Sequence, residues 1–370
     1  MSGPDFFELL PSPPHSIQDF ATWTSLETYK RSLPLAPNFI LGGFPPDLAR
    51  AYYSHTHGTD VGVFTLNNVT VTERGFIRHA GVPVACNYTH MSIPFCRSLL
   101  DDGSIHAEDD YHRITVETAT ILLTVGYDVY GHWLVDFLPK LHILAKTGYD
   151  IFKLKYLIPT DIMPYGLKWL HLLGLSDEQF IRYDPRKDIV AVEQLILPTV
   201  TRTGHREMDI FPECANFLKT LLDQNAGPTL AAEECGERIF VSRARAGRDG
   251  RALTNRAEIE AIAAAHGFYI FHPEILDIAQ QVAVFRSARQ IVGEYGSGMH
   301  GSMFSSPGTT VCLLRGTAYH PGFLQSGLCQ VLQQPCGYVF GAAPIDALNY
   351  DFTVDPEDFH AALELLRLMR

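Results

Sequence analysis

The stretch Gln290–Phe304, with the sequence QIVGEYGSGMHGSMF, decides the fold class. Its apolar start is typical of a buried strand, which runs directly into a Gly-x-Gly turn and a short helix predicted at Met299–Phe304. In an open parallel sheet, ligands bind outside the carboxyl ends of the strands, where such turns lie. Gly296 and Gly298 allow the backbone to approach a ligand closely, and the helix start offers N–H groups to an anion. A tight turn that needs glycine only for packing is the structural alternative.

Strands and helices alternate on both sides of this turn. The sequence predicts strands at Arg238–Ser242, Phe268–His272, Gln290–Gly293 and Thr310–Leu314, and helices at Asn255–His266 and Leu276–Ala288. This alternation favours a doubly wound parallel sheet with right-handed crossovers. A last amphipathic helix is predicted at Pro356–Arg370.

The first half of the chain has a less regular pattern. A weak helical patch is predicted at Asp19–Ser32. Alternating residues over Val61–Thr89 predict short antiparallel strands, with turns at Asn67-Asn68 and Glu73-Arg74-Gly75. An α/β pattern follows. Its predicted strands are Ala119–Val125, Lys155–Pro159, Phe180–Tyr183 and Val190–Leu197, and its predicted helices are Gly131–Lys146 (kinked or divided at Pro139), Tyr165–Leu173 and Pro212–Gln224.

The length and a Gly-Pro loop predict the domain organisation. A chain of 370 residues accommodates two domains of ordinary size. The loop at 225–228 and the acidic segment after it mark the predicted boundary. We therefore expect one domain at 1–228, a second at 229–350, and a terminal helix at 351–370 that could return to pack on the first domain.

Composition limits the classes of partner. The formal net charge of −12 disfavours broad attraction to nucleic acid or an anionic membrane, so a phosphate ligand needs a local basic site. There is no signal peptide pattern and no apolar run near the ~20 residues of a spanning helix. Seven scattered cysteines without a C-x-x-C pair suit reduced thiols. We expect a cytoplasmic protein.

Arg238–Asn255, RIFVSRARAGRDGRALTN, is a basic segment in an acidic chain. Arg243 follows the carboxyl end of a predicted strand and is expected at the same edge as the glycine turn. Arg251 and Asn255 precede the next helix, with Asn255 as its predicted N-cap. The planar fork of arginine suits phosphate oxygens. A solvated surface loop is the alternative, and we prefer it for Arg245 and Arg248.

The segment Asp128–Lys140, DVYGHWLVDFLPK, contains a candidate general base. His132 and Asp136 are four residues apart, so they share one face of a helix. A carboxylate beside a histidine stabilises the imidazolium that forms when the ring accepts a proton. A buried histidine with Asp136 as its structural partner is the equal alternative.

Other polar residues give weaker signals. Four residues in HAEDDYH resemble a metal cluster, although their spacing matches no zinc or calcium template: His106, Asp109, Asp110 and His112. We prefer an exposed acidic loop there and expect no metal site. Glu274, which follows a predicted strand, could accept hydrogen bonds from ribose hydroxyls. Glu294 lies just before the glycine turn and could orient His300 or contact a sugar.

Taken in order, four segments resemble glycosyltransferase family 61, which includes bacterial polysaccharide-synthesis proteins, plant xylosyl- and arabinosyltransferases, and animal protein O-GlcNAc transferases. They are GHWLVDFLPKL at Gly131–Leu141, FVSRARAGRDGRALTN at Phe240–Asn255, HGFYIFHPEILDIAQQVAVFRSA at His266–Ala288, and IVGEYGSGMHGSMFSSPG at Ile291–Gly308. The last three are nearly contiguous and together specific.

The resemblance implies an α/β fold of the GT-B type, with two Rossmann-like domains facing a cleft; here, extra antiparallel strands precede them. It also implies inversion at the anomeric carbon without a metal. Arg243, Arg251 and Asn255 would contact the nucleotide diphosphate, and Glu274 would belong to the same donor site. The turn would close on the diphosphate and sugar through Glu294, Tyr295, Gly296, Ser297, Gly298, Met299 and His300. Tyr295 stands where many members have histidine, and His300 replaces a frequent threonine or alanine.

The resulting hypothesis is sugar transfer from a UDP-linked donor to a hydroxyl of a glycan acceptor in bacterial-type polysaccharide or glycoconjugate synthesis. His132, or Asp136 directly, would remove the acceptor proton, and no cofactor beyond the nucleotide-sugar co-substrate would be needed. The expected partners are the donor, the acceptor and a peripheral membrane assembly for polysaccharide synthesis, with no nucleic acid. Two alternatives stay open: a nucleotide-sugar epimerase or dehydrogenase, the latter disfavoured by the missing early Gly-x-Gly-x-x-Gly, and an inactive binding scaffold.

Overall fold

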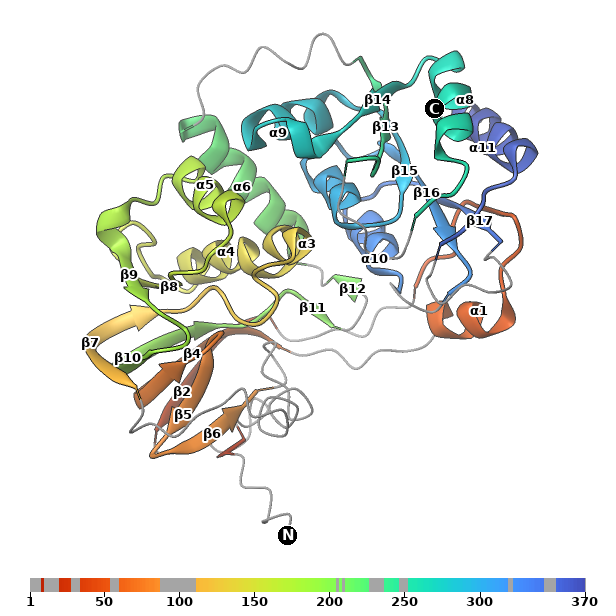
Figure 1. Ribbon diagram of the computed structural model, residues 1–370. Helices are drawn as coiled ribbons and strands as arrows, with labels where there is room; N and C mark the ends of the chain where they lie inside the picture. The colour runs from red at the N-terminus through yellow and green to blue at the C-terminus, as the bar shows by residue number, and fades with distance from the viewer. Residues whose placement is uncertain are drawn as a thin grey trace. The chain divides into compact units, whose positions relative to one another are not determined.

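The chain folds into two compact units, each assembled from separate stretches of sequence. The computed structural model describes residues 8–9, 20–27, 34–53, 60–86, 111–203, 206–207, 210–225, 236–245, 252–318, 322–342 and 351–369. The first unit comprises residues 1–30, 58–203 and 216–225, and the second comprises residues 31–57, 204–215 and 226–370. Both units contain a β-sheet with helices, so the protein is a mixed α/β protein (Figure 1).

The second unit is built on a six-stranded sheet. Its strands are β3 (Phe39–Leu41), β13 (Arg238–Val241), β14 (Tyr269–Phe271), β15 (Gln290–Glu294), β16 (Thr310–Gly316) and β17 (Cys336–Gly341). They lie in the order β14-β13-β15-β16-β17-β3, and every neighbouring pair is parallel. The predicted parallel sheet is therefore confirmed. The order along the chain reverses between β13 and β15, which is the switch point of a doubly wound sheet.

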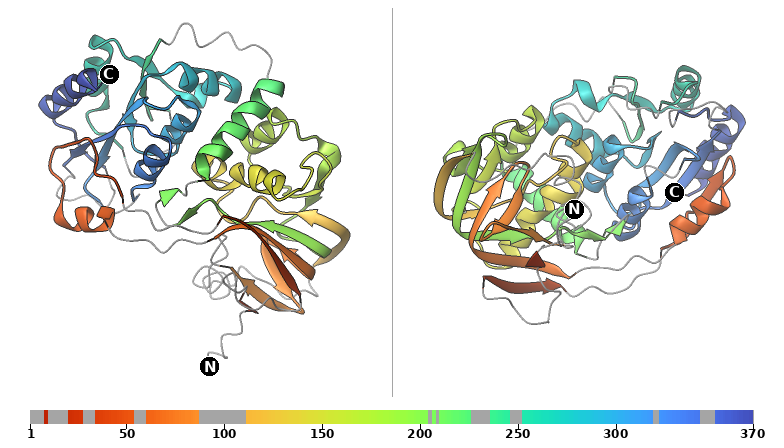
Figure 2. Two further views of the ribbon diagram at one scale, coloured as in Figure 1. Left: turned by 180° about the vertical axis from the view of Figure 1, so that it is seen from behind. Right: turned by 60° about the horizontal axis from the view of Figure 1, so that its bottom comes forward.

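Helices cover both faces of this sheet (Figures 1 and 2). On one side, α8 (Arg256–Ala265) packs against α11 (Pro356–Leu368); on the other, α9 (Ile278–Ser287) and α10 (Leu324–Val331) pack on the 3₁₀ helix η5 (Ser297–Phe304). Alternate strand residues supply the core between sheet and helices. The α11 side chains that join this core are Phe359, Ala362, Leu363 and Leu366. The last helix thus packs within the second unit, where the sequence allowed a return to the first.

An N-terminal segment completes the second unit. Strand β3 pairs in parallel with β17, and α1 (Pro46–Tyr53) follows it. The Asn38 Oδ1 atom accepts a hydrogen bond from the Cys336 backbone N–H at 2.9 Å. A Cβ atom on Gly337 would lie 2.2 Å from the Phe39 ring, so glycine makes room for this edge strand. Residues 31–57 therefore lie outside the unit to which the predicted boundary at residue 228 assigned them.

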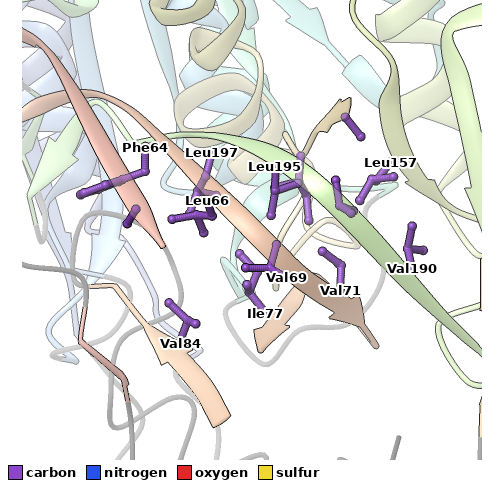
Figure 3. Packing of buried hydrophobic residues seen from close by; sticks show 14 of the residues in the cluster. Phe64, Leu66, Val69, Val71, Ile77, Val84, Leu157, Val190, Leu195 and Leu197 are labelled. Carbon is purple, nitrogen blue, oxygen red and sulfur yellow. The ribbon is translucent and has the colours of Figure 1, made fainter. Parts of the chain in front are cut away.

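A nine-stranded mixed sheet organises the first unit. Its strands are β1 (Glu8–Leu9), β2 (Ala21–Glu27), β4 (Val61–Thr72), β5 (Phe76–His79), β6 (Val82–Ala85), β7 (His112–Thr120), β8 (Tyr156–Pro159), β9 (Phe180–Tyr183) and β10 (Asp188–Pro198). The order is β1-β6-β5-β4-β10-β7-β8-β9, and β2 also pairs with β4. The stretch β10-β7-β8-β9 and the pair β1-β6 are parallel, while β4 pairs antiparallel with β10, β5 and β2. Figure 3 shows side chains from β4 and β10 packing in its hydrophobic core.

Three local predictions in the first unit are wrong. The helical patch at Asp19–Ser32 is instead strand β2, because tertiary pairing with β4 overrides a weak local preference. The turn predicted at Asn67-Asn68 is absent: β4 continues through it, with Asn68 in the left-handed region at φ 53°. The strand predicted at Ala119–Val125 lies earlier, because β7 ends at Thr120 and the buried residues that follow form no strand.

The first unit also contains the helices that carry its candidate site. They are α3 (Tyr130–His132), the π-helix η2 (Trp133–Phe137), α4 (Pro139–Lys146), α5 (Pro164–Leu172), the 3₁₀ helix η3 (Asp177–Gln179) and part of α6 (Phe211–Asn225). Proline lacks the N–H that would continue an α-helix, so Pro139 begins a new helix as its first residue. The turn before it is π-helical, with the Leu138 N–H donating to the Trp133 carbonyl at 3.0 Å. Among the described residues, no helix is long and apolar enough to span a bilayer.

Candidate functional site

At the switch point of the second unit, Arg243 lies against the turn that follows β15. The Arg243 Nη1 atom donates a hydrogen bond to the Tyr295 carbonyl at 3.4 Å. A Cβ atom on Gly296 would lie only 1.9 Å from Arg243 Nη1. Gly296 has a φ of 168°, which any residue adopts, so a larger residue there would meet the Arg243 side chain and no backbone strain. The predicted arginine and the predicted glycine turn thus meet where doubly wound sheets bind ligands.

Glu294, at the end of β15, connects Arg243 and Arg256 through hydrogen bonds. Its Oε1 atom accepts from the Arg243 backbone N–H at 3.1 Å and from Arg256 Nε at 2.6 Å, and its Oε2 atom accepts from Arg256 Nη2 at 2.9 Å. The Glu294 side chain is 1% exposed, whereas that of Arg256 is 23% exposed. Both carboxylate oxygens are therefore used inside the protein. Glu294 was expected to orient His300 or to contact a sugar, but His300 pairs with Gln325.

The other side chains of the turn are mostly buried. Burial raises the pKa of Tyr295 to about 12, and its hydroxyl accepts from the Gln325 backbone N–H at 3.3 Å. The His300 Nδ1 atom lies 2.8 Å from Gln325 Oε1, and Met299 is fully buried. Only Ser297 and Gly298 are partly exposed. A ligand at this turn would therefore meet Arg243, Ser297 and backbone amides before it met Tyr295, Met299 or His300.

Three remaining donor-site predictions have different outcomes. Asn255 precedes α8 as expected, but its side chain makes no capping bond; it donates to the Val354 carbonyl at 2.8 Å and accepts from the Val354 N–H at 3.2 Å. Glu274 is exposed on the 3₁₀ turn η4 (Pro273–Ile275). Arg251 lies outside the described residues, as does Arg248.

The residues that resembled a metal cluster are mostly undescribed. His106, Asp109 and Asp110 lie outside the described residues, and His112 is exposed, with its Nδ1 atom 3.3 Å from Asp188 Oδ1. Within the described part of the chain, no three His, Cys, Asp or Glu side chains are grouped so that they could hold a metal ion.

The first unit brings together the predicted pair His132 and Asp136 and adds Arg202. The His132 Nδ1 atom lies 2.5 Å from Asp136 Oδ2. Arg202 donates from Nε to Asp136 Oδ1 at 2.5 Å and from Nη2 to Asp136 Oδ2 at 3.2 Å. The Asp136 side chain is 0% exposed, while that of His132 is 32% exposed. Of the two candidate bases, only His132 reaches solvent, and Asp136 is placed to orient it.

The surroundings of this triad fix the imidazole and the π-helical turn. Gly126 has a φ of 90°, and a Cβ atom there would lie 2.8 Å from His132 Cδ2. Pro139 cannot donate to the carbonyl of Val135, four residues earlier, as an α-helix requires. The Thr201 hydroxyl, next to Arg202 in the chain, donates to that carbonyl at 3.3 Å instead. One short segment thus supplies both the missing helix bond and the clamp on Asp136.

A second buried cation lies near the same carboxylate. Lys140 is fully buried, and its Nζ atom donates to the Leu122 carbonyl at 2.7 Å. Burial lowers the pKa of Lys140 to about 8, although the Asp136 charge acts in the opposite direction. Two cationic side chains, Arg202 and Lys140, therefore interact with Asp136.

Sequence reasoning missed Arg202 and Arg256. Arg256 had a weak signal, since it directly follows Asn255 and extends the basic segment by one more arginine. Arg202 had none, because 66 residues separate it from Asp136 and no local pattern links the two. Both side chains use the planar fork that makes arginine suited to bidentate carboxylate contact.

A mixed α/β protein with a doubly wound unit and charged residues gathered at its switch point belongs to a broad class of ligand-binding folds. The family model for Glycosyltransferase 61 matches residues 130–312, about half of the chain, from the helix of His132 into β16. The chain belongs to glycosyltransferase family 61, and its general class is that of a glycosyltransferase. A search of curated proteins found no match to this chain.

Proposed function

We propose that this protein is an inverting, metal-independent glycosyltransferase that moves a sugar from a UDP-linked donor to a hydroxyl of a glycan acceptor, in bacterial-type polysaccharide or glycoconjugate synthesis. One observation carries the proposal: Arg243 lies across Gly296 at the switch point of the parallel sheet. A cation and a glycine turn at this position suit the diphosphate of a nucleotide-sugar.

The second unit is the proposed donor site. The Arg243 guanidinium and the backbone amides after Gly296 would neutralise charge that develops on the leaving diphosphate. Glu294 and Arg256 would support these groups, because their hydrogen bonds fix the Arg243 backbone. Asn255, Glu274 and Arg251 remain proposed donor contacts, and the buried side chains of Tyr295, Met299 and His300 would act by shaping the turn.

The first unit is the proposed acceptor side. His132 would accept the proton of the acceptor hydroxyl as that oxygen attacks the anomeric carbon. The bond between this carbon and the diphosphate oxygen then breaks, and UDP leaves with the bonding electrons. The displacement inverts the anomeric centre. The mechanism requires both units to act on one donor and acceptor pair, as in the GT-B arrangement with two domains at a cleft that the family resemblance implies.

The proposed location is the cytoplasm, with peripheral association at the inner face of the membrane. The cysteines support it: among the described residues, Cys312, Cys329 and Cys336 are buried and form no disulfide. Free buried thiols suit a reducing compartment, where nucleotide-sugars are available as donors.

Ligand-induced stabilisation tests the donor proposal. We expect UDP and UDP-sugars to raise the melting temperature of the purified protein, because a ligand that binds only the folded state stabilises it by mass action. ADP and NAD are matched controls that should give smaller shifts. The shift by UDP and the turnover of UDP-sugars should persist in excess EDTA. Stabilisation by NAD alone would support a dehydrogenase, and no response to any nucleotide would support a scaffold.

A further inference from the structure

We propose that Arg202 is a positioning residue for the candidate base His132, acting through Asp136; this inference rests on the proposed function. Arg202 contacts both carboxylate oxygens of Asp136, at 2.5 and 3.2 Å. Asp136 in turn holds His132 Nδ1 at 2.5 Å. The chain of contacts runs from Arg202 to His132, whose side chain is the most exposed of the three at 32%.

Geometry explains why Asp136 needs a second partner. A carboxylate can rotate about its Cβ–Cγ bond, and His132 Nδ1 contacts the Oδ2 atom of Asp136. The two parallel donors of Arg202 fix the plane of the carboxylate, since a bidentate arginine adds directional constraint as well as charge. Fixing this plane fixes the direction in which Oδ2 faces His132, and with it the orientation of the imidazole.

Charge gives a second reason. Asp136 is completely shielded from solvent, and an isolated ionised carboxylate is costly in such a place. Arg202 supplies the compensating charge through direct hydrogen bonds, with the buried Lys140 as a further cation nearby. Asp136 can then accept a hydrogen bond from the Nδ1–H group of a neutral His132 ring, which leaves Nε2 as the proton acceptor.

A hydrogen bond of the neighbouring residue Thr201 positions Arg202 beside Asp136. Pro139 deprives the Val135 carbonyl of its helix donor, and Thr201 donates to that carbonyl instead. Thr201 thereby anchors the segment from β10 to β11 (Arg202–Thr203) on the π-helical turn. Arg202, the next residue, is brought within reach of Asp136. Pro139 and Arg202, 63 positions apart, are therefore linked through the hydrogen bond from Thr201 to Val135.

The first experiment needs no substrate. The proton shared by His132 Nδ1 and Asp136 is expected to give a strongly downfield N–H resonance in the wild-type ¹H NMR spectrum, absent from Asp136→Asn. We expect Arg202→Gln to remove or broaden this signal and Arg202→Lys to restore it in part. Arg182→Gln, which breaks an exposed Arg–Asp pair at 3.2 Å in the same unit, is the matched control and should leave the signal unchanged.

The second experiment measures release of UDP from UDP-N-acetylglucosamine and UDP-xylose. We expect Arg202→Gln to lower kcat by about 10²-fold with little change in KM, because displacement of a catalytic group by about 1 Å costs about that factor. In a double-mutant cycle, adding Arg202→Gln to Asp136→Asn should lower kcat no further, since Arg202 acts only through Asp136.

Each outcome decides the proposal. An intact downfield resonance with wild-type kcat in Arg202→Gln would overturn it, and so would additive losses in the double variant, which would make Arg202 a direct substrate contact. Should Arg202→Gln not fold, Arg202→Lys and the charge-neutral double variant carry the same comparison. Should the wild type release no UDP, the proposed function fails, while the NMR experiment still tests the role of Arg202.

Discussion

Asp136 in the first unit and Glu294 in the second are both buried carboxylates held by an arginine fork, and they differ in what they hold in turn. Asp136 contacts the ring of His132, whose side chain is 32% exposed. Glu294 contacts the backbone N–H of Arg243, just before a turn of backbone amides. The Arg202–Asp136 pair therefore orients an imidazole that can exchange a proton. The Arg256–Glu294 pair orients backbone that can bind an anion. The comparison leads to the hypothesis that the first unit serves proton transfer and the second unit serves charge stabilisation.

The largest expected effect is at His132. We expect His132→Ala to lower kcat for UDP release in the presence of acceptor by about 10²–10⁴-fold, the usual contribution of a general base. Stabilisation of the protein by UDP should remain, because His132 belongs to the proposed acceptor side. Steady-state kinetics and a UDP thermal-shift titration measure the two quantities separately. Loss of UDP stabilisation with unchanged kcat would make His132 a donor contact and remove the proposed division.

The next largest effect is expected at Arg243. We expect Arg243→Ala to lower turnover by about 10²–10³-fold, equivalent to about 2.7–4 kcal/mol, since it removes one preorganised donor to the leaving group. Unlike His132→Ala, it should also weaken stabilisation by UDP. Arg245→Ala is the matched control, because Arg245 lies two residues further along and is exposed. Equal losses in the two variants would show a general effect of local charge and no specific role for Arg243.

The fold of the second unit was more predictable than that of the first for a physical reason. Parallel strands buried on both faces give continuous apolar runs, and Val311–Leu314 in β16 shows such a run. The first unit is a mixed sheet in which β2 and the middle of β4 depend on distant partners, so local preference misassigned both. The edge strand β3 was not predictable at all, because its three residues become a strand only by pairing with β17.

The residues of the candidate sites also fall into two groups, those that the sequence could pair and those that it could not. His132 and Asp136 could be paired from their spacing, and Arg243 and the glycine turn from their strand ends. Arg202 and Arg256 could not be assigned their partners, because contacts over 66 and 38 residues leave no periodic trace. Burial of Tyr295, Met299 and His300 was also hidden, since a glycine-rich turn gives no sign of which side chains face inward.

The smallest expected effects come from two glycines, and they sharpen the comparison most. A Cβ atom at Gly126 would lie 2.8 Å from His132 Cδ2, and a Cβ atom at Gly296 would lie 1.9 Å from Arg243 Nη1. We expect Gly296→Ala to fold normally, because its backbone is extended and the flexible Arg243 can move aside, but to weaken stabilisation by UDP. We expect Gly126→Ala to lower kcat and leave UDP stabilisation intact, because the added methyl group displaces the imidazole.

Of these two substitutions, only Gly126→Ala should also destabilise the fold. Gly126 has a φ of 90°, so alanine there adds backbone strain of about 1–2 kcal/mol that Gly296→Ala does not impose. Urea unfolding measures this difference directly. Gly81→Ala is the control for strain alone, since Gly81 has a φ of 80° and nothing lies within 4 Å of its built Cβ. If Gly126→Ala and Gly81→Ala reduced kcat alike, the loss would follow from strain, and contact with His132 would have no part in it. A loss of kcat confined to Gly126→Ala, with loss of UDP stabilisation confined to Gly296→Ala, would assign proton transfer and anion binding to separate units.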